Sequence, residues 1–177
     1  MSVGALAQIS EEEKLVAELE LLGIHYLSRQ SLYRAESVRP PEKLLSALVQ
    51  QPSARVRASV IAVLLTHPEY AQVVSIALQS LSPARQITLR LYYIAAFLLQ
   101  RIFAERLKPR LGERWQWLPE LFSESFDLTN GTPRENLIRL GREYQRLTQT
   151  VVNWAGSCED VARRLLRQWD LESQWKE

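Results

Sequence analysis

The amino-acid sequence predicts an all-α fold, a single domain built as a bundle of about six to eight helices. Apolar residues recur at spacings of three and four, which is the period of a helix with one buried face. Glycine occurs only six times in 177 residues, which leaves little material for the tight turns of a many-stranded sheet. The only Asn-Gly dipeptide, Asn130-Gly131, is followed by a helix start. A composition of 46% hydrophobic and 24% charged residues also excludes a disordered chain.

The N-terminal part should contain a capped helix. Residues 1–9 are expected to be disordered or loosely held, and residues 10–37 to form the N-terminal helices of a single domain that spans 10–177. Ser10 and Glu13 have the spacing of a capping box, and the acidic first turn suits the positive end of a helix dipole. Gly23 is expected to break or weaken this helix before a second helical stretch over 24–35.

Residues 40–107 are expected to form central helical hairpins, because prolines and serines divide them at regular intervals. The last of these helices is apolar on nearly every side between Leu91 and Leu99, so we expect it at the centre of the domain. The four expected helices cover residues 42–50, 53–66, 69–81 and 84–107.

Two halves of this central region look alike, with an offset of about 30 residues that is typical of helical solenoid repeats. In each half a short helix precedes a small cap and a strongly apolar helix, with Ser53-Ala54-Arg55 echoed by Pro83-Ala84-Arg85. The pattern over residues 40–106 resembles the HEAT family, with Arg55-Val56-Arg57 standing where the second helix of that repeat begins. The resemblance implies two HEAT-like helical hairpins at the centre of the bundle, the alternative being two unrelated antiparallel helix pairs.

The remaining chain divides into an irregular, tryptophan-containing segment over 108–131 and a C-terminal helical hairpin over 132–176. Thr132-Pro133-Arg134-Glu135 combines an N-cap hydroxyl, a first-turn proline and a third-position glutamate, so a helix should begin there. Apolar residues continue at alternating spacings of three and four as far as Trp154, and Gly156 should end this helix. Ser157 is expected to cap the last helix.

Residues that carry recognisable chemistry are scarce. The two histidines, His25 and His67, lack a second ligand type at metal-binding spacing, and His67 ends an apolar stripe where it could bond free helix carbonyls. The single cysteine, Cys158, has acidic neighbours that oppose a thiolate. No glycine-rich phosphate loop occurs. We therefore expect no catalytic residues, no cofactor, no metal site and no small-molecule ligand, the alternative being an enzyme without a recognisable motif.

Positive charge gathers in the middle third of the chain, where nine basic and three acidic side chains lie between Arg55 and Leu118. Cations near tryptophans can contact phosphates and stack on bases, although cations also stabilise a helix C-terminus without any ligand. A second set of arginines shares one face of the helix after Thr132, and a tryptophan near the C-terminus is a possible partner anchor. The candidate binding surface comprises Arg101, Arg106, Lys108, Arg110, Arg114, Trp115, Trp117, Arg139, Arg142, Arg146 and Trp175.

These observations favour a non-enzymatic adaptor or accessory subunit that acts through contacts with a protein partner or with a second copy of itself. The competing hypothesis is a nucleic-acid-associated protein that contacts the phosphate backbone through the basic segment 101–114. A lone thiol and the lack of a secretory signal favour the cytoplasm. No membrane role is expected, because the longest apolar run, Leu91 to Leu99, falls well short of the roughly 20 residues that cross a bilayer.

Overall fold

The computed structural model describes residues 8–28 and 32–176, and this part of the chain is an all-α bundle with no strand. The predicted disorder of residues 1–9 falls almost entirely on residues outside the described ranges. Eight α-helices and three short 3-10 helices account for the described secondary structure. The α-helices are α1 (Glu11–Leu21), α2 (Pro41–Val49), α3 (Ala54–Thr66), α4 (Val74–Gln79), α5 (Pro83–Ile102), α6 (Ala104–Leu111), α7 (Pro133–Thr148) and α8 (Trp154–Gln174).

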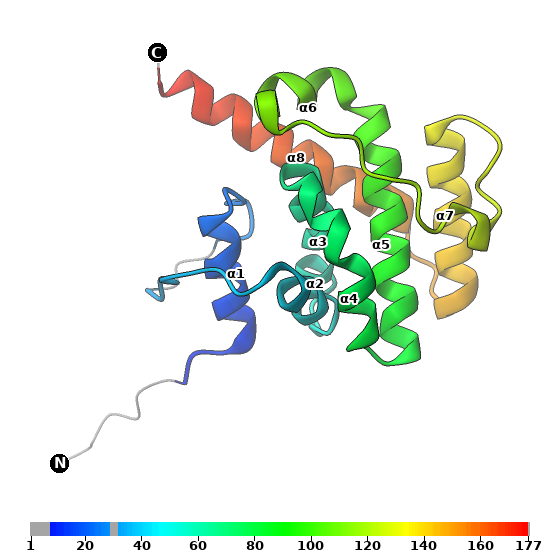
Figure 1. The fold of residues 1–177 in the computed structure, drawn as a ribbon, viewed down its shortest axis with the longest axis horizontal. Helices are drawn as coiled ribbons and strands as arrows, with labels where there is room; N and C mark the ends of the chain where they lie inside the picture. Colours follow the sequence, from blue (N-terminus) through cyan, green and yellow to red (C-terminus); the bar gives the residue numbers. More distant parts are fainter. Residues whose placement is uncertain (1–7, 29–31, 177) are drawn as a thin grey trace.

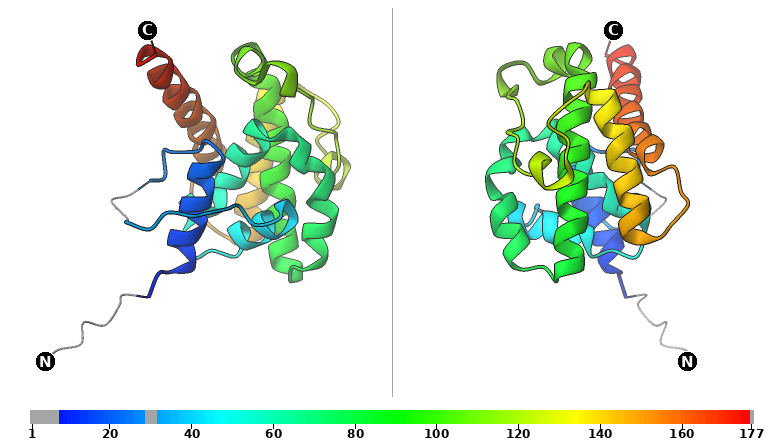
Figure 2. Two further views of the ribbon diagram at one scale, coloured as in Figure 1. Left: turned by 60° about the vertical axis from the view of Figure 1, so that its left-hand side comes forward. Right: turned by 90° about the vertical axis from the view of Figure 1, so that its right-hand side faces the viewer.

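Helix α5 lies at the centre of the bundle, as its sequence predicted. It packs against α3 on one side and α7 on the other, and α8 crosses behind them (Figure 1). Nearly every side chain from Leu89 to Leu99 is buried, so the helix is enclosed around its whole circumference. The extended segment after α6 runs back along α5, and α6 and the C-terminal end of α8 project at one end of the molecule (Figures 1 and 2).

Helix α1 begins with the predicted capping box, since the Ser10 hydroxyl accepts from the Glu13 amide and the Glu13 carboxylate accepts from the Ser10 amide. It ends at Leu21, and Gly23, where the sequence predicted a break or a weak point, has a φ of +84° that allows the Ile24 amide to donate back to the Leu19 carbonyl. The second helix expected over 24–35 is therefore wrong for the described residues, which form turns and extended chain up to α2. A glycine in the left-handed conformation ends a helix, and the apolar spacing after it is too weak a signal to continue the helix.

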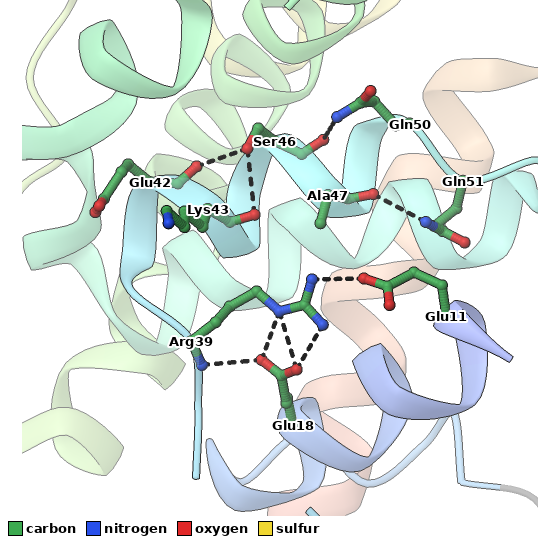
Figure 3. Close-up of polar contacts among 9 residues, drawn as sticks. All are labelled: Glu11, Glu18, Arg39, Glu42, Lys43, Ser46, Ala47, Gln50 and Gln51. Atoms are coloured by element: carbon green, nitrogen blue, oxygen red, sulfur yellow. Dashed lines mark hydrogen bonds and ion pairs between the residues drawn. The ribbon is translucent and has the colours of Figure 1, made fainter. Parts of the chain in front are cut away.

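Arg39 ties α1 to the chain that leads into α2 (Figure 3). Its guanidinium donates to both oxygens of the buried Glu18 carboxylate, with the shortest contact 2.7 Å from Nη2 to Oε1. The Arg39 amide donates to the same carboxylate, and Nη1 reaches Glu11. Because α1 lies at the edge of the bundle in Figure 1, this cluster supplements the apolar contacts of Leu15 and Leu19.

The central region contains α2 and α3 as predicted, but the structure does not confirm the HEAT-like repeat. The helix expected over 69–81 is instead a 3-10 helix (Pro68–Val73) followed by the six-residue α4. Its counterpart in the first half, α2, is a continuous helix of nine residues, so the two proposed hairpins differ in their first members. The proline at the start of this segment supplies no amide donor, and the first turn tightens into 3-10 geometry.

Helix α5 ends at Ile102, about one turn earlier than predicted. Phe103 leaves helical geometry, with φ of −107° and ψ of +16°, and the chain bends by 92° into α6. The bend places Leu107 and Leu111 of α6 in the buried set. Within the described residues, no single helix combines the length and mean hydropathy needed to cross a bilayer. Two pairs of consecutive helices reach that length and hydropathy when each pair is taken together, but the pairs are bent by 92° and 114°.

The C-terminal hairpin starts where the sequence predicted. Thr132 and Glu135 form the second capping box. However, α7 ends at Thr148 instead of continuing to Trp154, because Gln149 adopts the left-handed conformation. The last helix begins three residues before the predicted cap, since the Asn153 side chain accepts from the Gly156 amide and caps α8 at Trp154.

Candidate functional site

The basic segment 101–114 is one of the binding surfaces predicted from the sequence. Within it, Arg101 has a structural role. Its guanidinium lies 3.5 Å from the centroid of the Phe97 ring and donates to the carbonyls of Phe97 and Leu118. Burial lowers the pKa of this guanidinium from its usual value. Arg101 therefore fastens the irregular segment to α5 and has few donors left for an external ligand.

The two tryptophans of the irregular segment form an edge-to-face pair with ring centroids 5.1 Å apart. Lys108 on α6 places its ammonium over both rings, 5.5 Å from Trp115 and 4.9 Å from Trp117. Trp115 is half-buried against the core, while 48% of Trp117 is exposed. One ring is more buried than the other, as expected for alternate residues of an extended backbone. The two indole rings and the Lys108 ammonium stabilise one another.

The segment that carries these tryptophans is held by buried polar side chains of α5. The Gln100 amide donates to the Gln116 carbonyl and accepts from the Leu118 amide, both at 2.8 Å. The Tyr93 hydroxyl donates to the Pro119 carbonyl at 2.6 Å. Neither Gln100 nor Tyr93 was singled out from the sequence, where both fall in or beside an apolar run.

Two further cations of the segment are paired with α8. Arg106 and Arg110 each contact one oxygen of Asp170, at 2.8 and 3.0 Å. Arg110 also donates to the Ser173 hydroxyl. Arg114, by contrast, is exposed and makes no ion pair within the described part of the chain. The structure thus assigns most of the predicted basic patch to contacts inside the protein.

The arginines of α7 lie on its exposed side, and two of the three have internal partners. Arg139 donates to the Asn130 carbonyl, and Arg146 forms an ion pair with Glu143 one turn earlier. Arg142 is exposed and has no hydrogen bond or ion pair among the described residues. Among the described residues, no hydrogen bond or ion pair joins these side chains to the segment 101–114.

Trp175, the last predicted site residue, stands at the end of α8 with 88% of its surface exposed. It borders an open groove of about 560 Å³ between α8 and the turn that follows α1. We call this the α8 groove; it is lined by His25, Tyr26, Arg164, Arg167, Gln168, Leu171, Glu172 and Trp175.

The walls of the α8 groove are fixed by hydrogen bonds across it. Gln168 accepts from the His25 amide and donates to the Gly23 carbonyl, both at 2.8 Å. The His25 ring lies between Glu172, 2.9 Å away, and the Glu20 carbonyl. Arg164 and Arg167 are exposed and make no ion pair or hydrogen bond in the described ranges, so the free charge of the groove is positive. The sequence offered no signal for this juxtaposition, because its two sides lie more than 140 positions apart.

A second hollow opens beside the groove and shares Tyr26 and Arg164 with it. This aromatic cavity has a volume of about 360 Å³ and is enclosed by the first turns of α3 and α8 together with tyrosines from three other segments. Its lining residues are Tyr26, Ala54, Arg55, Ala58, Tyr92, Tyr144, Val152, Trp154, Ser157, Cys158, Asp160, Val161 and Arg164.

Cys158 and His67, two potentially reactive side chains, both make contacts that belong to the packing of the bundle. Cys158 is buried, and burial raises the pKa of its thiol, so it is held in the neutral form. His67 donates from Nε2 to the Leu22 carbonyl, 3.0 Å away, so it supports the end of α1 and not the end of its own helix. Within residues 8–28 and 32–176, no three histidine, cysteine or carboxylate side chains converge as a metal site.

Comparison with known proteins found no matching family model, no matching curated protein and no matching solved structure.

Proposed function

We propose that this protein is a non-enzymatic adaptor that binds an acidic, amphipathic segment of a protein partner in the α8 groove. The observation that carries the proposal is Trp175, a large apolar side chain that is almost fully exposed at the rim of a groove with unpaired arginines. Tryptophan and arginine are the residue types that contribute most to binding energy at protein interfaces.

The apolar part of the α8 groove consists of side chains one turn apart. Leu171 and Trp175 both belong to the exposed large hydrophobic residues of the chain, at 48% and 88% exposure. Residues four positions apart lie on one face of a helix, so the two form a continuous strip along α8. A partner helix could bury this strip with its own apolar face.

The charge of the groove favours an acidic occupant. Arg164 and Arg167 supply two guanidiniums that have no hydrogen-bond or ion-pair partner in the part of the chain that the structure describes. The one carboxylate among the lining residues, Glu172, is bonded to His25 and Gln168. Guanidinium forks bind carboxylates in a bidentate manner. An occupant with glutamates or aspartates beside its apolar anchors therefore complements the groove better than a basic one.

The groove is also preorganised, which reduces the entropy lost on binding. Gln168 fixes the turn after α1 on one side of α8, and Asp170 is held by Arg106 and Arg110 on the other. The projecting end of α8 is therefore held on two sides, although it extends beyond the bundle (Figure 2).

Binding can be tested with two synthetic amphipathic helical peptides that share one leucine- and phenylalanine-rich face and differ only in bearing glutamates or lysines on the other. Titration calorimetry should show one-to-one binding of the acidic peptide, weakening with salt. Trp175→Ala should weaken it by about 30-fold or more, as loss of a hot-spot side chain does. The double variant Arg164→Gln with Arg167→Gln should also weaken it, whereas Arg142→Gln, the loss of one exposed charge on α7, should not.

Three results would contradict this proposal: no binding of the acidic peptide, equal binding of the basic one, or affinities that are unchanged in Trp175→Ala. Sedimentation velocity adds a fourth. A dimer that forms with increasing concentration and disappears in Trp175→Ala would assign the groove to a second copy of the chain.

Nucleic-acid binding has weaker support, which rests on Arg114 and the exposed ring of Trp117. Because Arg101, Arg106 and Arg110 are engaged internally, few cations of segment 101–114 remain to neutralise phosphates. If this function exists, a single-stranded oligonucleotide should bind at low ionic strength and lose affinity in Arg114→Gln. Absence of binding under those conditions would exclude it.

A further inference from the structure

We infer that the aromatic cavity between α3 and α8 is a binding site for a small, flat, apolar molecule that bears an anionic group such as a carboxylate. This goes beyond the proposed adaptor function, which uses the neighbouring α8 groove. The volume of about 360 Å³ falls at the lower end of the range of small-molecule pockets.

The walls of the cavity are mainly aromatic. Trp154 stacks on Tyr144, with ring centroids 4.6 Å apart and planes 11° from parallel, and Tyr92 tilts against the same indole at 5.5 Å. These rings come from α8, α7 and α5, so three helices fix one aromatic surface. Flat apolar molecules gain both area burial and ring contacts on such a surface.

Two residues that line the cavity bury hydrogen-bonding atoms that have no partner among residues 8–28 and 32–176. They are the Tyr26 hydroxyl and the Trp154 indole nitrogen. The Tyr92 phenol lies close to the indole, but the indole N–H has no acceptor in hydrogen-bond geometry. A buried polar group without a partner is rare and costs stability, so its retention points to a ligand or a bound water.

Both unpartnered atoms can donate a hydrogen bond, and the indole N–H can only donate. Burial raises the pKa of the Tyr26 phenol, which keeps its proton in place. A ligand that satisfies the two must therefore bring an acceptor. Neither atom is open to solvent in this conformation, so the inference requires the tyrosine or tryptophan ring to rotate when the ligand binds.

The charge around the cavity favours an anionic acceptor. Arg55 and Arg164 contribute two guanidiniums, and Asp160 is the one carboxylate among the lining residues. Arg55 donates one N–H to the Tyr26 carbonyl at 2.7 Å, which leaves its other donors for a ligand. The first turns of α3 and α8 also line the cavity, and the N-terminal ends of helices carry partial positive charge.

The probe for this site is 2-naphthoate, with 2-naphthamide as its neutral isostere and 2-naphthylmethylammonium as its cationic counterpart. Calorimetry on the full chain should give saturable one-to-one binding of naphthoate, weaker binding of the amide and none of the ammonium. Tyr26→Phe removes the hydroxyl without changing the ring and should weaken naphthoate binding by about 10-fold, as expected for one hydrogen bond to a charged group. Arg164→Gln should also weaken it.

Ala58→Leu should abolish naphthoate binding, because the added side chain fills the cavity from α3. A thermal unfolding scan should be run to check that this variant is folded. Ala54→Leu, on the exposed first turn of the same helix, is a second variant that should fill the cavity. Trp175→Ala is the control that separates the two proposals, since it should leave naphthoate binding intact while weakening binding of the acidic peptide. Arg164 lines both sites, so the two sites are distinguished by Trp175→Ala and by the cavity-filling variants, not by Arg164→Gln.

Four outcomes would overturn the inference: no saturable binding of naphthoate, unchanged binding in both cavity-filling variants, equal affinity for the ammonium compound, or equal affinity for the amide with no effect of Arg164→Gln.

Discussion

Replacing Arg39 with methionine should destabilise the protein by about 3 kcal/mol, the lower end of the cost of leaving a buried carboxylate without its cation. The carboxylate is that of Glu18, whose side chain is only 9% exposed, while the Arg39 side chain is 24% exposed. The substitution removes the guanidinium contacts with Glu18 and keeps the backbone amide of residue 39 as a donor. That remaining hydrogen bond is the reason for the lower estimate.

Urea unfolding followed by far-ultraviolet circular dichroism measures this loss, and in a thermal scan it should lower Tm by about 6–12 °C for a chain of this size. Hydrogen exchange should show faster exchange in α1 than in α5, because α1 can relieve the charge by leaving the bundle. Adding Glu18→Leu to the variant should recover most of the stability, since it removes the uncompensated charge.

The matched control is Arg146→Met. Arg146 also pairs with a glutamate, Glu143, but its side chain is 69% exposed, so this variant should unfold at the wild-type urea concentration. Two results would refute the reasoning: equal effects of the two arginine variants, or a double variant at residues 18 and 39 that is no more stable than Arg39→Met alone.

Three other predictions follow from close contacts and burial. Gly141→Ala should lower the free energy of unfolding in urea by about 1–3 kcal/mol, because the added Cβ would lie 2.9 Å from the Cβ of Ala155. Combining it with Ala155→Gly should restore stability. A single variant as stable as the wild type would disprove this contact between the helices. Gln100→Leu should lower the free energy of unfolding by about 2–4 kcal/mol, because two backbone groups of the tryptophan segment lose their hydrogen-bond partner. Tryptophan emission should shift to the red. Unchanged stability would show that Gln100 does not hold the tryptophan segment. Burial raises the pKa of the Cys158 thiol, so Ellman's reagent should label the protein at about pH 8 only when urea unfolds it. In the unfolded chain this thiol ionises near pH ~8.5. The stability that comes from burying the neutral thiol is therefore complete below that pH and declines above it. Rapid labelling of the native protein would contradict this burial.

Local hydrogen bonding could be predicted from the sequence because its donors and acceptors lie within one turn. The capping boxes at Ser10 and Thr132 are each formed by residues three positions apart, and both are present. The central place of α5 followed from composition alone, since a helix that is apolar around its circumference must be enclosed. The end of α1 near Gly23 was also expected, but the same local logic was wrong for the helix expected over 24–35 and at Asn153, which caps α8 a few residues before the expected cap.

The surfaces depended on contacts between distant parts of the chain. Whether an arginine has an internal partner cannot be predicted from its sequence neighbours. Asp170 neutralises two cations of the predicted patch from 60 or more positions away, whereas Arg164 and Arg167 have no partner among the described residues. The α8 groove and the aromatic cavity are formed by segments that meet only in the folded bundle. Periodicity along a helix determines which side chains turn inward, whereas the tertiary packing of helices decides which outward charges and rings come together.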